Sequence, residues 1–290
     1  MPKIKKNFKA LTELFKARFL RRLAEDDYTN LLSETLLAYG NIKEFSKLKR
    51  LSSLFRKAYR TILSNCQYEY VYKTTVLNDI FFRYHNFSTA FYTTEFYCGK
   101  SKADIAIFNG FATAYEIKTK YDNLEKLGKQ ILDYKKVFGK VFVVVDESHL
   151  INIKKKIDEN IGVLLFQDNG TVSEIKNAVE DYSCSDSNYL FDCLHKNEYK
   201  KIVHEYIGRE LNIPNALEYS KYKQIFIEIP KNEAQQYVIQ NLRLRALAAP
   251  RLSLINKVPS CLYQAILDAN LTTTMSTSII LKMEKPFELA

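Results

Sequence analysis

Residues 101–119 read SKADIAIFNGFATAYEIKT, and this stretch decides the fold that we expect. Apolar, β-branched and aromatic residues dominate both sides of Asn109-Gly110, a dipeptide typical of the turn between two antiparallel strands. We predict strands over 103–108 and 112–119, joined as a hairpin. Residues 89–98 have the same composition and predict a third strand just before them.

The register of this hairpin determines which side chains share a face. A two-residue loop would place Asp104 and Glu116 on opposite faces of the sheet. A three-residue loop over 108–110, with Gly110 in the left-handed region, pairs Asp104 with Ala114 and puts both acids on one face. We predict the second register, because it also gathers the large apolar residues of both strands on the other face.

The rest of the chain supplies helices to cover such a sheet. Asp122 opens one of them, with Glu125 three residues later as in a capping box. The predicted helices span 8–60, 68–84, 122–138, 189–210 and 231–248, and short apolar runs predict further strands at 141–145, 162–166 and 224–229. This order predicts an α/β fold, a mixed sheet flanked by helices with helical N- and C-terminal extensions. The domains expected are a basic helical region (1–64), a sheet-containing core (65–182) and, beyond a polar loop, a mainly helical region (189–290).

Charge is unevenly distributed along the chain. The 290 residues are 47% hydrophobic and 26% charged, which is typical of a globular protein. Residues 1–60 contain 15 Lys and Arg against 6 Asp and Glu, whereas the remainder contains 28 against 27. A polyanion partner for the basic region is one interpretation and a solvated helical face is a second. A transit peptide or membrane-surface helix over residues 3–23 is a third, which the acids at 25–27 make less favoured. Apolar runs fall short of the roughly 18 residues of a membrane span, and five scattered cysteines without a CxxC motif favour the cytoplasm.

Asp104, Glu116 and Lys118 suggest a metal-dependent reaction. Glu116 and Lys118 are two residues apart on one strand, so both project from the same face. Two neighbouring carboxylates repel each other unless a cation lies between them, and Mg²⁺ or Mn²⁺ is commonly held by carboxylates, waters and a substrate phosphate. A lysine beside the metal positions water and offsets charge in the transition state. The arrangement suits hydrolysis of a phosphodiester.

The pattern Asp104…Glu116-Ile-Lys118, followed by a helix with Gln130 and Tyr134, resembles the PD-(D/E)XK nuclease superfamily over residues 65–146. Within it, the chain is similar to an uncharacterised bacterial branch that reads Glu-Ile-Lys-Thr, Asp-x-Leu-x-x-Leu and Gln-x-x-x-Tyr. The resemblance implies a restriction-endonuclease-like sheet, with Asp104 and Glu116 as metal ligands and Lys118 as the catalytic lysine. It also implies that Gln130 and Tyr134 lie near the metal or the DNA.

The superfamily adds a further acid from the helix before the sheet. By resemblance Glu69, near the start of the 68–84 helix, is our candidate for this catalytic metal ligand, and Glu95 on the first strand is its rival. Both have simpler explanations, since an acid favours a helix N-terminus and a charge protects an edge strand. Lys102 either contacts phosphate or covers the sheet edge.

We therefore expect a cytoplasmic, Mg²⁺- or Mn²⁺-dependent nuclease, endo- or exonucleolytic, that acts on DNA rather than RNA and not at a membrane. Its terminal helical regions are expected to bind nucleic acid, a second copy or a partner protein. Two alternatives stay open: a catalytically silent nuclease fold that binds nucleic acid or supports assembly, and an RNA nuclease on the same fold. The sequence contains no phosphate-binding glycine motif of nucleotide sites and no histidines at metal-ligand spacing.

Overall fold

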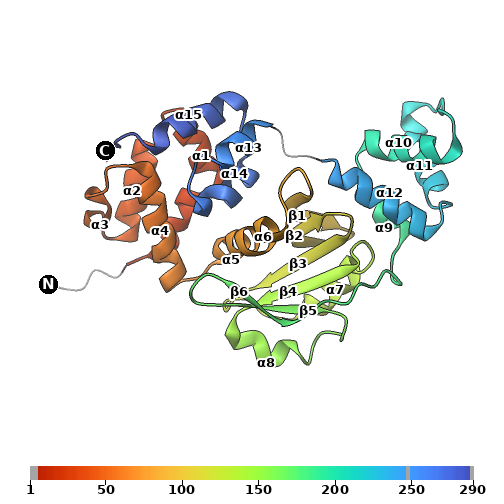
Figure 1. The fold of residues 1–290 in the computed structure, drawn as a ribbon, viewed down its shortest axis with the longest axis horizontal. Coiled ribbons are helices and arrows are strands. Elements are labelled where there is room, and N and C mark those ends of the chain that lie inside the picture. The colour runs from red at the N-terminus through yellow and green to blue at the C-terminus, as the bar shows by residue number, and fades with distance from the viewer. Residues whose placement is uncertain (1–5, 246–248, 288–290) are drawn as a thin grey trace. The chain divides into compact units, whose positions relative to one another are not determined.

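The computed structural model describes residues 6–245 and 249–287 (Figure 1). They form two compact units. The first collects the described residues of Met1–Tyr84, Phe166–Val172 and Leu247–Ala290, and the second collects those of His85–Leu165 and Ser173–Ala246. In the described ranges, no helix combines the length and the apolar character needed to cross a membrane.

The first unit is helical. Helix α4 illustrates why: Leu51, Leu54, Phe55, Ala58 and Ile62 recur at helical spacing and are buried, while the other face is polar. The elements of this unit are η1 (Phe8–Phe15), α1 (Ala17–Ala24), α2 (Thr29–Tyr39), α3 (Lys43–Ser46), α4 (Leu51–Asn65), α5 (Glu69–Thr75), the π-helical η2 (Val76–Phe81), α6 (Phe82–Tyr84), α13 (Ala249–Ile255), η5 (Ser260–Leu262), α14 (Tyr263–Ala269) and α15 (Thr273–Met283).

Both ends of the chain contribute to this first unit, which differs from the three consecutive domains predicted. The last carbonyls of α1 have no partner within the helix, and side chains of α15 satisfy them. Lys282 Nζ donates to the carbonyl of Leu23 at 2.6 Å, and Ser278 Oγ donates to that of Ala24 at 2.7 Å. A sequence pattern contains no signal for such a contact across more than two hundred residues.

The second unit contains most of a six-stranded sheet in the order β1-β2-β3-β4-β5-β6. Strands β1, β2 and β3 are antiparallel neighbours, and β3, β4 and β5 are parallel, so the predicted mixed α/β fold is confirmed. The elements are β1 (Phe91–Cys98), β2 (Ser101–Phe108), β3 (Ala112–Lys118), α7 (Leu127–Tyr134), β4 (Lys140–Val145), η3 (Glu147–His149), α8 (Leu150–Ile153), β5 (Gly162–Phe166), β6 (Val172–Lys176), α9 (Ser187–Asp192), α10 (Lys196–Ile207), η4 (Asn215–Leu217), α11 (Glu218–Phe226) and α12 (Lys231–Arg243).

One face of the sheet forms a core with α7 and α9–α12. Phe96, Phe108 and Phe138 lie in the middle of it, with ring centroids 5.3 to 5.8 Å apart. Each buried phenylalanine contributes roughly 1.5–3 kcal/mol through removal of its ring from water. Small residues at Ala112 and Ala114 leave room on β3 for this packing. Helices α9–α12 therefore share a core with the sheet, although we predicted a boundary at 182–188.

The predicted strand at 224–229 is wrong. Its alternating isoleucines suggested a strand, but Glu218–Phe226 is α11. The buried residues there are Tyr222, Phe226 and Ile229, which follow helical spacing, while Ile227 is 45% exposed. Burial of the two aromatic rings on one helix face therefore outweighs the local β propensity of the isoleucines.

The other strands predicted before residue 170 are confirmed as β1–β5, and β6 was not predicted. The 68–84 helix is confirmed as the consecutive segments α5, η2 and α6. Helix α7 begins at Leu127 and not at Asp122, because the Asp122 carboxylate is engaged in the turn after β3. Its Oδ2 accepts from Thr119 N at 2.8 Å and from Thr119 Oγ1 at 2.7 Å. Residues 246–248 of the predicted helix at 231–248 lie outside the described residues, and its earlier part is α12.

Candidate functional site

The hairpin of β2 and β3 has a different register from the one predicted. Ala106 pairs with Ala114, and Ile105 pairs with Tyr115. The predicted pairing of Asp104 with Ala114 is therefore wrong by two residues. Because an offset of two preserves the alternation of side chains, the ladder still places Ile105 and Tyr115 on the face opposite Ala106 and Ala114.

The loop of the hairpin accounts for this offset. It consists of Asn109, Gly110 and Phe111, since Phe108 pairs directly with Ala112. Gly110 adopts φ +104°, a conformation that favours glycine. Asn109 Oδ1 accepts from Phe111 N at 3.2 Å, and the Phe111 side chain is 48% exposed. Phe111 is thus held in the loop and does not pair with β2.

Asp104 lies where β2 separates from β3. The ladder between these strands ends at the pair Ile105–Tyr115. Beyond it, Asp104 Oδ2 accepts a hydrogen bond from Ile117 N at 2.6 Å, so a carboxylate replaces the backbone carbonyl as the partner of this amide. The bond fixes the Asp104 carboxylate next to the peptide that follows Glu116.

Glu116, Lys118, Gln130 and Tyr134 form a hydrogen-bonded cluster between β3 and α7. Glu116 is 2% exposed, Lys118 is 9% exposed and Tyr134 is fully buried. Lys118 Nζ donates to Glu116 Oε1 at 2.7 Å and to Gln130 Oε1 at 3.1 Å. Gln130 Nε2 donates to Glu116 Oε1 at 2.5 Å, and the Tyr134 hydroxyl lies 2.6 Å from Glu116 Oε2. The structure thus brings together four residues that the sequence motif singled out.

Tyr134 remains a hydrogen-bond donor over a wide pH range. Burial raises the pKa of its hydroxyl well above the usual value, and the negative charge of Glu116 raises that pKa further. The hydroxyl also lies 2.7 Å from the carbonyl oxygen of Lys102 on β2. Asp133, its neighbour on α7, accepts from Ser101 Oγ at 2.6 Å. These bonds hold α7 against β2 and orient the residues that contact Glu116.

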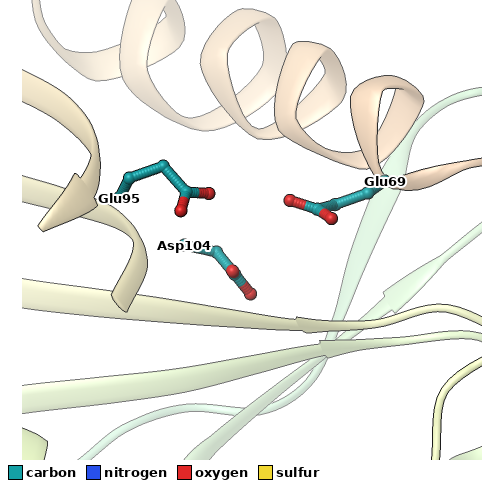
Figure 2. Close-up of side chains that lie close together, drawn as sticks. All are labelled: Glu69, Glu95 and Asp104. Atoms are coloured by element: carbon teal, nitrogen blue, oxygen red, sulfur yellow. The ribbon is translucent and has the colours of Figure 1, made fainter. Parts of the chain in front are cut away.

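Glu95 and Asp104 form an acidic pair on neighbouring strands, and Figure 2 shows both side chains. Their carboxylate oxygens come within 4.8 Å of each other. Lys102 Nζ lies 2.6 Å from Glu95 Oε2 and offsets part of the repulsion. Lys102 also lies over the ring of Tyr97, with its nitrogen 5.4 Å from the centroid. The sequence offered Glu95 as a rival acid, and the structure places it beside Asp104.

The backbone of β1 is unusual at Glu95. Its φ of +55° lies in the left-handed region, which costs a residue with a side chain about 1–2 kcal/mol. The flanking pairs are Thr94–Ile105 and Phe96–Ala103, so Glu95 stands opposite Asp104 in the sheet. Ala103 and Ala106 both pack into the core with α7, although they are three residues apart on β2. The regular alternation of side chains is therefore interrupted where the two acids lie.

Glu69 belongs to the first unit and is described within it. It is the first residue of α5, and its carboxylate forms an ion pair with Lys73 Nζ at 2.6 Å, one helical turn away. The helix dipole stabilises a carboxylate at this position, which is the simpler of the two explanations of Glu69 given by the sequence. Its assignment as a third metal ligand stays a prediction.

The donors present suit a hard divalent cation. Carboxylate oxygens at the separation of Glu95 and Asp104 are within reach of one Mg²⁺ or Mn²⁺, with metal–oxygen distances of about 2.1 Å, after small side-chain movements. Glu116, the second predicted ligand, instead contacts three protein side chains that can donate hydrogen bonds, Lys118, Gln130 and Tyr134. Among the described residues, no group of three or more ligand side chains at metal-binding spacing includes it.

Comparison with known proteins connects the chain to a phage family. The family described as Bacteriophage P4 protein cII matches residues 63–253, a stretch that contains Glu69, the acidic pair and the Glu116 cluster. Protein cII of Enterobacteria phage P4 is 29% identical over 147 residues, which are 50% of this chain and 54% of that protein. The chain thus aligns with about half the length of this relative.

A solved protein of unknown function from Silicibacter pomeroyi is also similar, with 18% identity and a TM-score of 0.30. The similarity covers 38% of this chain and 70% of that one. The family match is more extensive, because it covers more than half of the chain. The chain belongs to the bacteriophage P4 protein cII family.

Proposed function

We propose that this protein hydrolyses phosphodiester bonds in DNA with the help of Mg²⁺ or Mn²⁺. One observation carries the proposal: a buried lysine contacts a buried glutamate on β3, and the Asp104 carboxylate is fixed to the intervening peptide. Acids and a lysine in this spacing suit phosphoryl chemistry because they hold a cation and place positive charge near the reacting phosphate. The resemblance to the PD-(D/E)XK superfamily supports the same chemistry and, with it, a restriction-endonuclease-like fold.

The residues have separate roles in this proposal. Asp104 and Glu95 would hold the cation, and Glu116 could join them only by giving up one of its hydrogen bonds. Glu69 is the predicted further ligand. When bound, the cation supplies an activated water and neutralises charge on the phosphate. Lys118 orients the attacking water with its ammonium group. Gln130 and Tyr134 hold Glu116 and Lys118 in place, so we regard them as positioning residues.

A second candidate function is nucleic-acid binding without catalysis. The observation in its favour is that protein side chains contact both carboxylate oxygens of Glu116: Oε1 accepts from Lys118 and Gln130, and Oε2 lies beside the Tyr134 hydroxyl. A carboxylate that binds a metal in an active site has to give up such hydrogen bonds when the metal binds. In a protein that binds nucleic acid without catalysis, these hydrogen bonds can stay in place.

Cleavage assays separate these functions. Supercoiled, linear and single-stranded DNA, and RNA, are incubated with the protein in Mg²⁺, Mn²⁺ or EDTA. We expect metal-dependent cutting of DNA by the wild type and at least about a hundredfold slower cutting by Lys118→Ala, which removes the positive charge next to the phosphate. Preferential cutting of RNA would show that the RNA-nuclease alternative is the correct one.

The matched control is Lys201→Ala, prepared identically, because Lys201 is exposed on α10 of the same unit. It should cut at the wild-type rate. Cutting that survives in Lys118→Ala would refute the assigned site. Absence of cutting by the wild type in every condition, combined with salt-sensitive binding, would favour the second candidate.

A further inference from the structure

Helix α4 of the first unit carries a groove that is lined, apart from Leu48, by basic and polar side chains. The groove has a volume of about 510 Å³. Its lining includes Ser53, Arg56, Lys57, Arg60, Thr61 and Ser64. These residues follow the spacing i, i+3, i+4, i+7, i+8 and i+11, so they form one face of the helix. The opposite face is the buried apolar one described above.

The charges of this groove have no ion-pair partners among the residues of the unit that the structure describes. The 15 residues of α4 include neither Asp nor Glu. Arg56, Lys57 and Arg60 are all exposed, and none of them forms an ion pair within the part of the chain that the structure describes. Arg56 and Arg60 are one helical turn apart, where like charges repel. A solvated face normally mixes both signs, so this face lacks an anion.

Glu44, the acid whose pKa the charge of Lys57 affects, does not balance the positive charge of the groove. The charge of Lys57 contributes to a lowered pKa of Glu44, but the largest cause of that shift is the hydrogen bond from Lys6. Tyr39 and Asn41 also donate to the Glu44 carboxylate, at 3.0 and 2.7 Å. Glu44 is therefore already engaged by other donors. The groove remains a cationic surface with hydroxyl groups at its edge.

We propose that the α4 groove binds the phosphodiester backbone of a nucleic-acid duplex. Arginine and lysine bind phosphate oxygens through charged donors, and serine and threonine hydroxyls add neutral ones. The groove face from Ser53 to Ser64 extends about 17 Å along the helix, at about 1.5 Å per residue, and so faces several phosphates of one strand. Such contacts position a duplex without reading its sequence. This inference about the α4 groove depends on the proposed nuclease function in one respect, the choice of nucleic acid as the ligand.

Binding is measured in EDTA, so that cleavage does not interfere, by fluorescence anisotropy with two short DNA duplexes of unrelated sequence and with one RNA duplex. Salt is varied between about 50 and 200 mM. The groove variant combines Arg56→Gln, Lys57→Gln and Arg60→Gln, which removes charge and retains helix propensity. The control combines Lys154→Gln, Lys155→Gln and Lys156→Gln, three exposed lysines of the second unit.

We expect the slope of log affinity against log salt to become shallower by about 2.7 in the groove variant, at about 0.9 for each lost phosphate contact. Affinity near 0.1 M salt should fall on the order of a hundredfold, equally for both DNA sequences. The control should keep the wild-type slope. Far-UV circular dichroism and the melting temperature establish that both variants fold.

An unchanged slope in the groove variant, or an equal loss in the control, would overturn the proposal. If the groove variant shows a shallower slope than the wild type with the DNA duplexes, DNA is the partner. If it does so with the RNA duplex alone, RNA is the partner. These results do not depend on catalysis. If the wild type cuts nothing but the groove variant shows the shallower slope, the groove inference stands and the nuclease function fails.

Discussion

Replacing Tyr134 with phenylalanine tests the buried cluster most directly. The change removes one hydroxyl and nothing else from a fully buried side chain. The hydroxyl has one proton, which it shares between Glu116 Oε2 at 2.6 Å and the carbonyl oxygen of Lys102 at 2.7 Å, so one donated hydrogen bond is lost. A hydrogen bond to a charged group contributes about 1.5–3 kcal/mol. We therefore expect Tyr134→Phe to lower the free energy of unfolding by about 2 kcal/mol at pH 8.

The pH dependence gives this prediction a second, independent readout. The pKa of Tyr134 is raised in the folded protein, chiefly by burial and then by the charge of Glu116. As pH rises past about 10, the unfolded chain therefore releases this proton while the folded chain retains it. The stability that this hydroxyl confers is complete below that pH and is reduced by about 1.4 kcal/mol at pH 11. The difference between wild type and Tyr134→Phe should shrink accordingly.

Urea unfolding followed by far-UV circular dichroism, at pH 8 and pH 11, measures both effects. Other tyrosines titrate in both proteins and cancel in the difference. Tyr84→Phe is the control, because Tyr84 is 67% exposed, and its effect should be below about 0.5 kcal/mol. A loss below about 0.5 kcal/mol for Tyr134→Phe at pH 8, or a difference that is the same at pH 11, would refute the assigned hydrogen bonds.

Three further predictions concern the metal pair and the close packing of the second unit. At 10 mM, Mg²⁺ bound with a dissociation constant of about 1 mM should raise the free energy of unfolding by about 1.4 kcal/mol. The effect should disappear in Asp104→Asn, and its persistence there would place the cation elsewhere. Glu95→Gly should be about 1 kcal/mol more stable than Glu95→Ala, because glycine tolerates the φ of +55° and both variants lose the carboxylate; equal stabilities in urea would contradict the left-handed backbone. In Gly139→Ala, the added Cβ would lie 2.2 Å from the Tyr182 ring, so we expect a melting temperature lower by several degrees, from roughly 1–3 kcal/mol of overpacking.

The sheet was predictable because its pattern is local. Strands β1–β5 are runs of β-branched and aromatic residues, and Gly110 sits in the hairpin loop where a positive φ was expected. The register was not predictable from that pattern, since alternation specifies a register only to within multiples of two. In the loop that forms, Phe111 N donates to Asn109 Oδ1 and Asn109 N donates to the carbonyl of Phe111, contacts that composition does not reveal.

The candidate site was predictable to a similar extent. The spacing of Gln130 and Tyr134 on a helix indicated that both face one partner, and both contact Glu116. The left-handed backbone at Glu95 was not predictable, because that residue lies in a strand pattern without glycine or asparagine. Its pairing with Asp104 follows from the register of β1 and β2, in which Cys98 pairs with Ser101. Glu69 ranked first in the sequence because the resemblance implies an acid from the helix before the sheet.

The balance between catalysis and silent binding depends on two features of the second unit with opposite implications. The hydrogen bonds that Lys118, Gln130 and Tyr134 make to Glu116 stabilise the fold and favour a static scaffold. The acidic pair has a different character, because the left-handed φ at Glu95 is unfavourable, while Lys102 offsets part of the repulsion between the two carboxylates. A cation between Glu95 and Asp104 would reduce this repulsion further. The strained backbone at Glu95 is therefore consistent with the metal-dependent enzyme that we propose, in which binding of substrate and metal would loosen the Glu116–Lys118 pair.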